Sequence, residues 1–311
     1  MRGVFVIVSI LFLTSSGWFT YKSIAYGKEY KVNKNEYVKV LNFEERLLQA
    51  KEWIFTESEW RKRRVLSEDK LAIAEESYDN MLSMSLFVLA LCVVYLLSTV
   101  VLGILQKQLL VYLGIGIGLA AMPCLANGIA VPMMEISAFN TELTIPLEVK
   151  AKDYISEDIP LIGGYIKHLN MDLSQVFHGR MYYFYQSKSV LDLIFLLVKD
   201  GNWLVAICIL CFSIVLPVFK LLITLGFAFS RNPEKYKGIF NFSYALGKWS
   251  MADVFVAALF LGFLSFYNMN TGVETEAKTL AGMYYFLGYC VLSIISSILT
   301  ASKIKTLKTK L

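Results

Sequence analysis

Long apolar runs alternate with shorter charged segments along this chain, and the alternation predicts a protein embedded in a membrane. A helix that crosses the hydrocarbon core of a bilayer needs about 20 apolar residues. Runs of roughly this length predict six spans, over residues 4–19, 81–106, 109–134, 203–229, 251–267 and 280–301. The expected fold class is therefore an all-α membrane protein with about six transmembrane helices.

The first span and the charged segment behind it leave two questions open. The first apolar run has the shape of a signal-peptide core, but residues 13–19 (Leu-Thr-Ser-Ser-Gly-Trp-Phe) lack a clear small-x-small cleavage site. We therefore favour an uncleaved signal anchor over a cleaved signal peptide. Residues 22–80 are densely charged, and Glu57 and Glu59 each stand four residues before an arginine, which supports a helix. We expect one solvated exterior helix here rather than a dedicated docking site.

The polar segment 135–189 predicts a small exterior β element. Residues 141–149 alternate apolar and polar, and residues 178–186 are aromatic and strand-like. We expect these two stretches to pair with each other. A short amphipathic helix is expected over residues 190–198, directly before the fourth span.

Basic residues near the ends of the spans set the expected orientation. The loop after the fourth span and the C-terminal tail each carry several lysines or arginines, and the positive-inside rule makes both of them cytoplasmic. Counting back through an even number of crossings puts the N-terminus in the cytoplasm as well. The segment 135–189 and the loop around Glu274 and Glu276 are then exterior.

Composition narrows the function classes. The chain is 56% hydrophobic and only 18% charged, whereas soluble domains carry about a quarter charged residues. The net charge of +5 reflects basic membrane flanks, so we expect no nucleic-acid partner. There is no Gly-rich phosphate loop, no His-Glu-x-x-His motif and no zinc ribbon, so we expect neither an enzyme nor a bound metal or cofactor. All the cysteines fall inside apolar runs, and we interpret them as packing residues: Cys92, Cys124, Cys208, Cys211 and Cys290.

Two ionisable residues lie inside predicted spans, and such residues are functional candidates because insertion of each costs about 2.5–3.5 kcal/mol. Lys220 lies about ten residues before the end of the fourth span, or about 15 Å of helix, which a lysine stem reaches only in part. Asp253 lies near the start of the fifth span, just after Trp249 and Ser250. We expect Lys220 and Asp253 to meet as an ion pair or a water-linked pair.

Helical spacing extends this intramembrane polar site. Ser213, Pro217 and Lys220 share one face of the fourth span, and Ser250 shares a face with Asp253. Serines and a threonine also stripe the sixth span at residues 293, 296, 297 and 300. The alternative is structural: Lys220 snorkels, Asp253 caps a helix, and the hydroxyls only hold helices together. We favour that alternative for the hydroxyls alone and function for the charged pair.

Several motifs resemble the paraquat-inducible protein A family. Leu246-Gly-Lys-Trp-Ser-Met-Ala-Asp-Val-Phe is similar to the family signature, and Leu216-Pro-Val-Phe-Lys-Leu to the end of its preceding helix. Ala126-Asn-Gly-Ile-Ala-Val-Pro-Met is similar to an earlier family motif with one insertion, and Gly282 matches a small glycine near the sixth span. The resemblance covers residues 109–303.

The resemblance implies an inner-membrane protein that acts with MCE proteins, which form periplasmic tunnels for lipids. It also places Lys220 and Asp253 on the intramembrane polar residues of the family. Longer family members carry two such domains, each behind a zinc ribbon. This chain resembles a single-domain member, with a four-helix domain over 108–311 and an extension over 1–107 in place of the ribbon.

The function expected from residues and resemblance together is membrane lipid trafficking. The protein would bind a phospholipid or similar amphiphile and exchange it with a periplasmic tunnel protein. Two alternatives stay open. One is a tetraspan-like scaffold that organises partners without transport, and the other is a transporter of small solutes.

Overall fold

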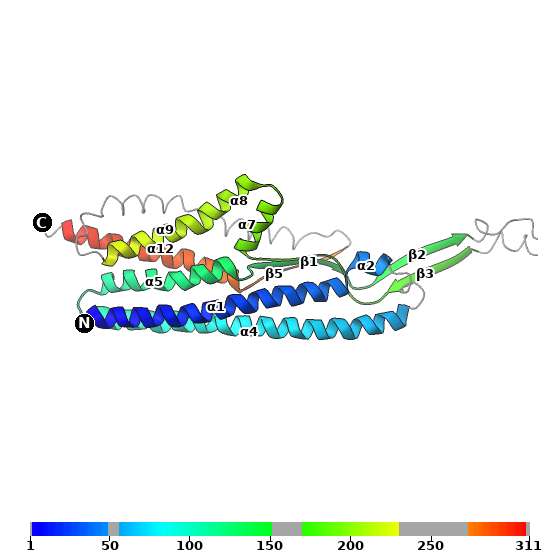
Figure 1. The fold of residues 1–311 in the computed structure, drawn as a ribbon, viewed down its shortest axis with the longest axis horizontal. Helices are drawn as coiled ribbons and strands as arrows, with labels where there is room; N and C mark the ends of the chain where they lie inside the picture. Colours follow the sequence, from blue (N-terminus) through cyan, green and yellow to red (C-terminus); the bar gives the residue numbers. More distant parts are fainter. Residues whose placement is uncertain (1, 49–55, 151–169, 230–272, 309–311) are drawn as a thin grey trace, which may run out of the picture.

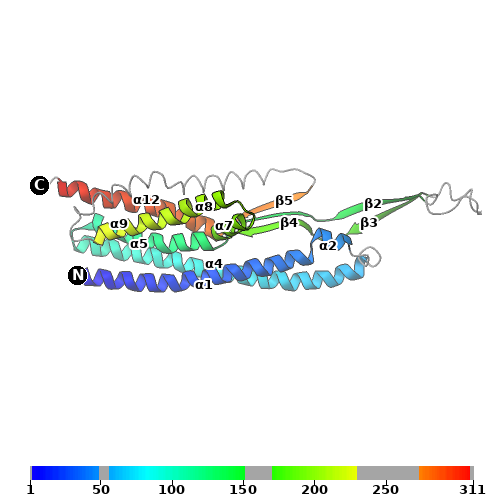
Figure 2. The same ribbon diagram turned by 45° about the horizontal axis from the view of Figure 1, so that its top comes forward.

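The computed structural model describes residues 2–48, 56–150, 170–229 and 273–308. Its long helices run along one axis, so that the start of α1 (Arg2–Val40) and the end of α12 (Ala281–Lys308) lie at the same end of the molecule (Figure 1). The strands lie beyond the start of α12 and beside the second half of α1, and the same arrangement is visible after a turn of 45° (Figure 2). One end of the molecule is therefore helical and apolar, and the other carries the β structure.

The two longest helices form a hairpin. Helix α1 (Arg2–Val40) packs along α4 (Thr56–Leu105), and the short helix α2 (Phe43–Leu48) follows α1. At 1.5 Å per residue, α1 is about 58 Å long and α4 about 75 Å, roughly twice the thickness of the hydrocarbon core. Each of the first two spans therefore continues without a break into the charged segment.

The charged segment is thus two helices, and the expectation of one solvated helix over 22–80 is wrong. The two halves are joined by polar contacts. Ser23 Oγ lies 2.8 Å from Ser85 Oγ, and Asn33 Nδ2 donates to Ser77 Oγ at 3.2 Å. Charge density and i,i+4 spacing indicate a helix but give no signal for the point at which it turns back.

Five helices among the described residues are long and apolar enough to cross a membrane. They coincide with five of the six predicted spans: Gly3–Val40, Glu57–Leu105, Leu109–Ala130, Trp203–Ile223 and Ala281–Thr300. The remaining predicted span, 251–267, lies outside the described residues. The chain is a multi-pass, all-α membrane protein with small antiparallel sheets, as the apolar pattern predicts.

Helix α5 (Leu109–Ala130) lies at the centre of the bundle and packs against α4, α1 and α12 (Ala281–Lys308). It ends four residues before the predicted end of the third span, because Val131, the residue before Pro132, is extended and a strand begins at Met134. Glycines allow its close contacts. A Cβ on Gly116 would lie 2.6 Å from Thr99 Cγ2, and one on Gly128 would lie 2.7 Å from Phe286 Cα.

Among the described residues, the β structure consists of two antiparallel units. A three-stranded sheet has the order β4 (Met181–Lys188), β1 (Met134–Asn140), β5 (Glu274–Thr279). A separate hairpin pairs β2 (Leu143–Lys150) with β3 (Asn170–Phe177) and projects away from the bundle (Figure 1).

The small β element is confirmed, but its predicted pairing is wrong. The stretch 141–149 pairs with β3 rather than with 178–186, and β4 pairs with β1 instead. The third strand, β5, comes from the loop around Glu274, outside the segment 135–189. Alternation along a strand shows which residues share a face, but it does not identify the partner strand.

Candidate functional site

The fourth span is a helix in three pieces. Helix α8 (Trp203–Leu210) passes through a π-helical turn, η2 (Cys211–Val215), into α9 (Leu216–Phe229). In this turn the N–H of Leu216 donates to Cys211 O, five residues earlier. Pro217 has no N–H to donate to the carbonyl of Ser213, and a π turn is one way in which a helix accommodates such a gap.

The predicted polar residues of this span lie at the break. Ser213 is in the π turn and only 2% exposed, Pro217 is buried, and Lys220 is half-buried one turn further along. Helix α9 packs against α5 and α12, whereas among the described residues α8 contacts mainly α7 and the π turn. The joint between these two pieces therefore carries the polar face.

The other half of the predicted site cannot be compared. Trp249, Ser250 and Asp253 lie outside the described residues, so the pairing of Lys220 with Asp253 stays a prediction. Pro217 was identified in the sequence as part of the polar face, but the π turn before it was not. A proline inside an apolar run is the signal that could have indicated an irregular helix there.

The hydroxyl stripe of the sixth span lies against helix backbone. Ser296 Oγ donates to Gly114 O on α5 at 2.7 Å. Ser297 and Thr300 donate to carbonyls one turn earlier in their own helix, both at 2.8 Å. These bonds match the structural interpretation favoured for the hydroxyls, because each hydroxyl donates to a backbone carbonyl and the bond from Ser296 joins α12 to α5.

A buried amide joins α5 to α1 inside the bundle. Asn127 is fully buried, and its Nδ2 donates to Thr20 Oγ1 at 3.1 Å and to Pro123 O at 3.2 Å. The sequence gives no signal for this contact or for the role of Thr20, since the two residues are more than 100 positions apart. The bond fixes the first span against the third.

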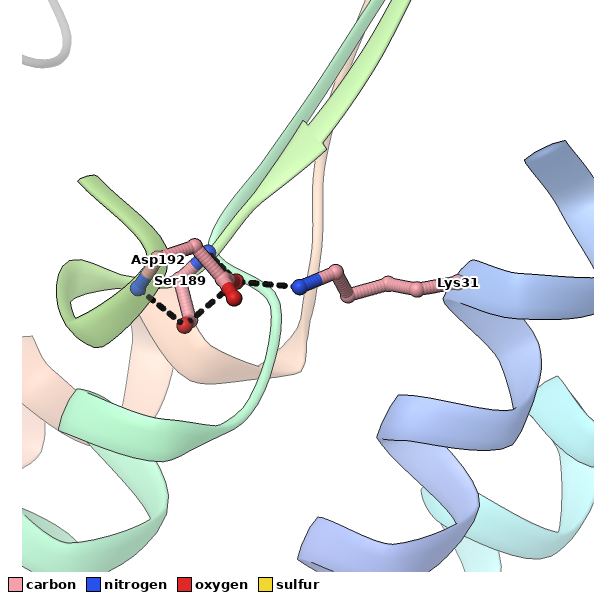
Figure 3. Close-up of polar contacts among 3 residues, drawn as sticks. All are labelled: Lys31, Ser189 and Asp192. Atoms are coloured by element: carbon pink, nitrogen blue, oxygen red, sulfur yellow. Dashed lines mark hydrogen bonds and ion pairs between the residues drawn. The ribbon is translucent and has the colours of Figure 1, made fainter. Parts of the chain in front are cut away.

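An ion pair fixes the helix that leads into the fourth span (Figure 3). Helix α7 (Val190–Lys199), predicted as a short amphipathic helix, begins with a capping box in which Ser189 Oγ accepts from Asp192 N and Asp192 Oδ2 accepts from Ser189 N at 2.8 Å. Lys31 of α1 pairs with the same carboxylate. Burial raises the pKa of Asp192, but the bonds from Lys31 and Ser189 lower it by more, so its pKa lies below the ordinary value.

This contact was missed in the sequence for an identifiable reason. The spacing Ser189-x-x-Asp192 before an apolar run is a capping-box signal that could have been found. Its partner Lys31 is 161 residues away, and nothing local points to it. The consequence is that α7 is tied to the long hairpin while α8 continues from its other end.

Metal-ligating residues are not gathered in the part of the chain that the structure describes. No group of three His, Cys, Asp or Glu residues there could hold a metal ion. All the cysteines are free thiols. His178 lies in the turn between β3 and β4, and its carbonyl accepts a bond from Arg46 at 3.1 Å; His168 lies outside the described residues.

Comparison with known proteins adds one finding. The family model described as paraquat-inducible protein A matches residues 174–303. No curated protein and no solved structure matches the chain. The matched region runs from β3 to α12 and contains Ser213, Pro217, Lys220 and Asp253, whereas α1, α4, α5 and β1 precede it. The match over residues 174–303 thus confirms the resemblance, and this region is similar to the paraquat-inducible protein A family.

Proposed function

We propose that this protein is an inner-membrane subunit of a lipid-trafficking system. It moves a phospholipid or a similar amphiphile between the inner membrane and a periplasmic tunnel protein of the MCE type. The family match over residues 174–303 supports a role in a membrane system of that family. The proposal goes further than the family match in two respects, which are the lipid cargo and the MCE partner.

The observation that carries the proposal is the position of Lys220. It lies in an apolar, membrane-spanning helix three residues after Pro217, next to the π turn. A lysine at such depth is costly, and polar residues beside broken helices line the substrate paths of many transporters. In the proposed mechanism Lys220 contacts the anionic head group or exchanges charge with Asp253 as α8 moves against α9.

The proposed energy source is the proton gradient. A buried lysine and aspartate that titrate together release and take up protons as their surroundings change. No ATP-binding motif is present in the sequence. We propose no covalent step, and therefore no enzymatic activity.

The proposed orientation puts both termini in the cytoplasm. The start of α1 and the end of α12 lie at the same end of the molecule (Figure 1), as an even number of crossings requires. The basic C-terminal tail lies at that end, and the positive-inside rule favours the cytoplasm for it. The sheet, the β2–β3 hairpin and the outer halves of α1 and α4 then extend into the periplasm.

The direct test is lipid transfer by the purified protein. Proteoliposomes that contain the purified protein and a fluorescent phospholipid would be mixed with acceptor liposomes and with the partner recovered by pull-down from native membranes. We expect Lys220→Met and Asp253→Asn each to reduce the transfer rate at least about tenfold, which corresponds to about 1.4 kcal/mol of lost interaction. Lys199→Met, at the exposed end of α7, is the matched loss of charge and should leave the rate unchanged. Full transfer by well-folded Lys220→Met and Asp253→Asn proteins would exclude the mechanism.

The β2–β3 hairpin favours a second candidate function. It projects away from the bundle and makes no close packing with the membrane helices among the described elements (Figure 1). A tetraspan-like scaffold that docks a partner there would lose function when residues 143–177 are deleted and keep it in Lys220→Met. Transfer of a small solute rather than lipid by proteoliposomes would favour the third candidate.

A further inference from the structure

The sheet presents a polar face to the long helices. In β1 the buried residues are Glu135, Ser137 and Phe139, whereas the alternate residues are only half-buried. Glu135 is 7% exposed, and its carboxylate accepts a hydrogen bond from the Tyr30 hydroxyl of α1. Burial and this carboxylate raise the pKa of the neighbouring Tyr185 phenol on β4. A buried carboxylate is costly, so its retention between a sheet and a helix invites an explanation.

A cavity of about 490 Å³ opens beside this layer. Three elements meet around it. Helix α1 contributes Tyr30 and Lys34, α4 contributes Glu75 and Tyr78, and β5 contributes Lys278, with Leu280 directly after the strand. Lys278 is opposite Glu135 in the register of β1 and β5, so its side chain leaves the same face of the sheet.

The depth of the cavity corresponds to the lipid head groups. Tyr78 stands three residues before the charge-free run that begins at Met81, and Leu280 directly precedes α12. Tyr30 packs against Tyr78 with ring centroids 5.2 Å apart. Tyrosines are enriched where spans leave the hydrocarbon, because the ring is apolar and the hydroxyl is wet. The cavity therefore lies at the surface of the bilayer, on the side of the sheet.

Two opposite charges on the cavity wall form no salt bridge among the described residues. Lys34 is half-buried, its ammonium lies 5.0 Å from the centroid of the Tyr37 ring, and Glu135 and Glu75 interact with it electrostatically without direct contact. Glu75 is exposed and forms no ion pair there. Lys278 pairs with Glu276 at 2.9 Å, and this bond raises the pKa of Lys278. A site whose cation and anion form no salt bridge with each other suits a ligand that carries both charges.

Charge balance argues against a simple anion. Three cations, Lys34, Lys278 and the neighbouring Arg180, balance three carboxylates, Glu75, Glu135 and Glu276. The site therefore has no excess of positive charge that would attract a ligand with net negative charge. A zwitterion can place its phosphate on the lysines and its amine on Glu75 and the face of Tyr78.

We propose that this cavity binds the phosphate-and-amine head group of a zwitterionic aminophospholipid in the outer leaflet of the membrane. The phosphodiester lies between Lys34 and Lys278, and the primary ammonium lies against Glu75 and Tyr78. The site is separate from Lys220 and extends the proposed function, since four of its wall residues lie in the N-terminal extension, outside the family match. It can be present whether or not Lys220 takes part in transfer.

The test measures lipid retention, not transfer. The full-length protein in detergent micelles would be titrated with phosphatidylethanolamine and with phosphatidylglycerol of identical acyl chains, and bound lipid counted by native mass spectrometry. We expect phosphatidylethanolamine to bind at least about tenfold more tightly, and Lys34→Met to remove at least about tenfold of that affinity. Lys34→Arg should retain most of the affinity. Lys28→Met, an exposed lysine on the same helix, is the matched control and should behave as the parent.

A second variant tests the part of the site that binds the amine. Glu75→Gln should weaken phosphatidylethanolamine and leave phosphatidylglycerol unchanged, so that the preference disappears. Equal binding of the two lipids by the parent, or unchanged binding by a folded Lys34→Met, would overturn the proposal. Soluble glycerophosphoethanolamine has the same head group without acyl chains, and it tests whether the ligand is a membrane lipid. Tight binding of this compound, without gain from acyl chains, would overturn the assignment to a membrane lipid.

Discussion

The α1–α4 hairpin and the fourth span are both long and apolar, yet they are held in different ways. The hairpin helices run unbroken and are connected at several depths: Phe12 stacks on Tyr95 with centroids 4.1 Å apart, and Ser9 Oγ lies 2.8 Å from the Tyr95 hydroxyl. The fourth span has a π turn in its middle, and its first piece, α8, exposes Trp203 and Leu204.

On the basis of this difference, we divide the described membrane helices into a closely packed frame and a jointed element. The frame consists of α1, α4, α5 and α12, whose contacts include interlocked glycines and interhelical hydrogen bonds. Among the described spans, the jointed element alone contains a π turn, and it carries Lys220. Motion needs an element with few tight contacts, so the comparison predicts that changes in the frame affect stability and changes in the joint affect transfer.

Gly128→Ala tests the frame with the largest expected effect. The added Cβ would lie 2.7 Å from Phe286 Cα, so α5 and α12 must separate. We expect a loss of about 1–3 kcal/mol in the free energy of unfolding, measured by denaturant titration in detergent. Gly288→Ala in α12 is the matched control, because nothing lies within 4 Å of its Cβ. An equal loss in both variants would show that α5 and α12 are not closely packed.

Pro217→Ala tests the joint. Without the proline, the backbone N–H can bond to Ser213 O, and we expect the π turn to relax into a regular helix. Stability should be unchanged or higher, while lipid transfer should fall about tenfold, or by about 1.4 kcal/mol in activation free energy. Hydrogen exchange over residues 211–217 would report the change in helix. A variant that relaxes to a regular helix and still transfers lipid at the parental rate would show that the break has no role in transfer.

The frame was largely predictable from sequence, because its signals are local. The apolar runs 81–106 and 109–134 predicted the end of α4 and most of α5. Pro217 and Lys220 were singled out, since a proline and a lysine stand out in an apolar run. The turn-back of the hairpin and the π turn were not predicted, because neither leaves a periodic pattern.

Long-range pairings were the other part that sequence could not supply. Strand β5 joins β1 across a separation of about 140 residues, and Lys31 meets Asp192 across 161. In both cases the residue types on each side are ordinary. Periodicity identifies the face that a strand or helix buries, but the partner is fixed only by tertiary packing. The head-group cavity, which needs three such elements, was invisible for the same reason.

Asp192→Asn tests the contact by which the frame holds the helix that leads into the jointed element. The change keeps the shape of the capping box but removes the charge that holds α7 to Lys31, and we expect a loss of about 1 kcal/mol at pH 7. Because the folded pKa of Asp192 is lowered, its contribution is present above its unfolded value near 3.9 and is lost as the pH falls through the lower folded pKa. Unfolding temperatures of parent and variant should therefore differ at pH 7 and converge toward pH 3. Asp200→Asn, at the other end of α7, should show no such convergence, and a constant difference for Asp192→Asn would contradict the ion pair.

Ser296→Ala has the smallest expected effect on stability, and it distinguishes the frame from the jointed element most directly. Its hydroxyl donates to Gly114 O between α12 and α5, and such bonds in membrane proteins contribute about 0.6 kcal/mol on average. Ser297→Ala, whose bond stays within its own helix, is the control for loss of a hydroxyl and should cost less. Neither change should alter the rate of lipid transfer, whereas Ser213→Ala in the π turn should alter the rate with little change in stability. If Ser296→Ala slowed transfer as much as Ser213→Ala, the hydroxyl stripe would belong to the lipid path, and the division into frame and joint would fail at α12.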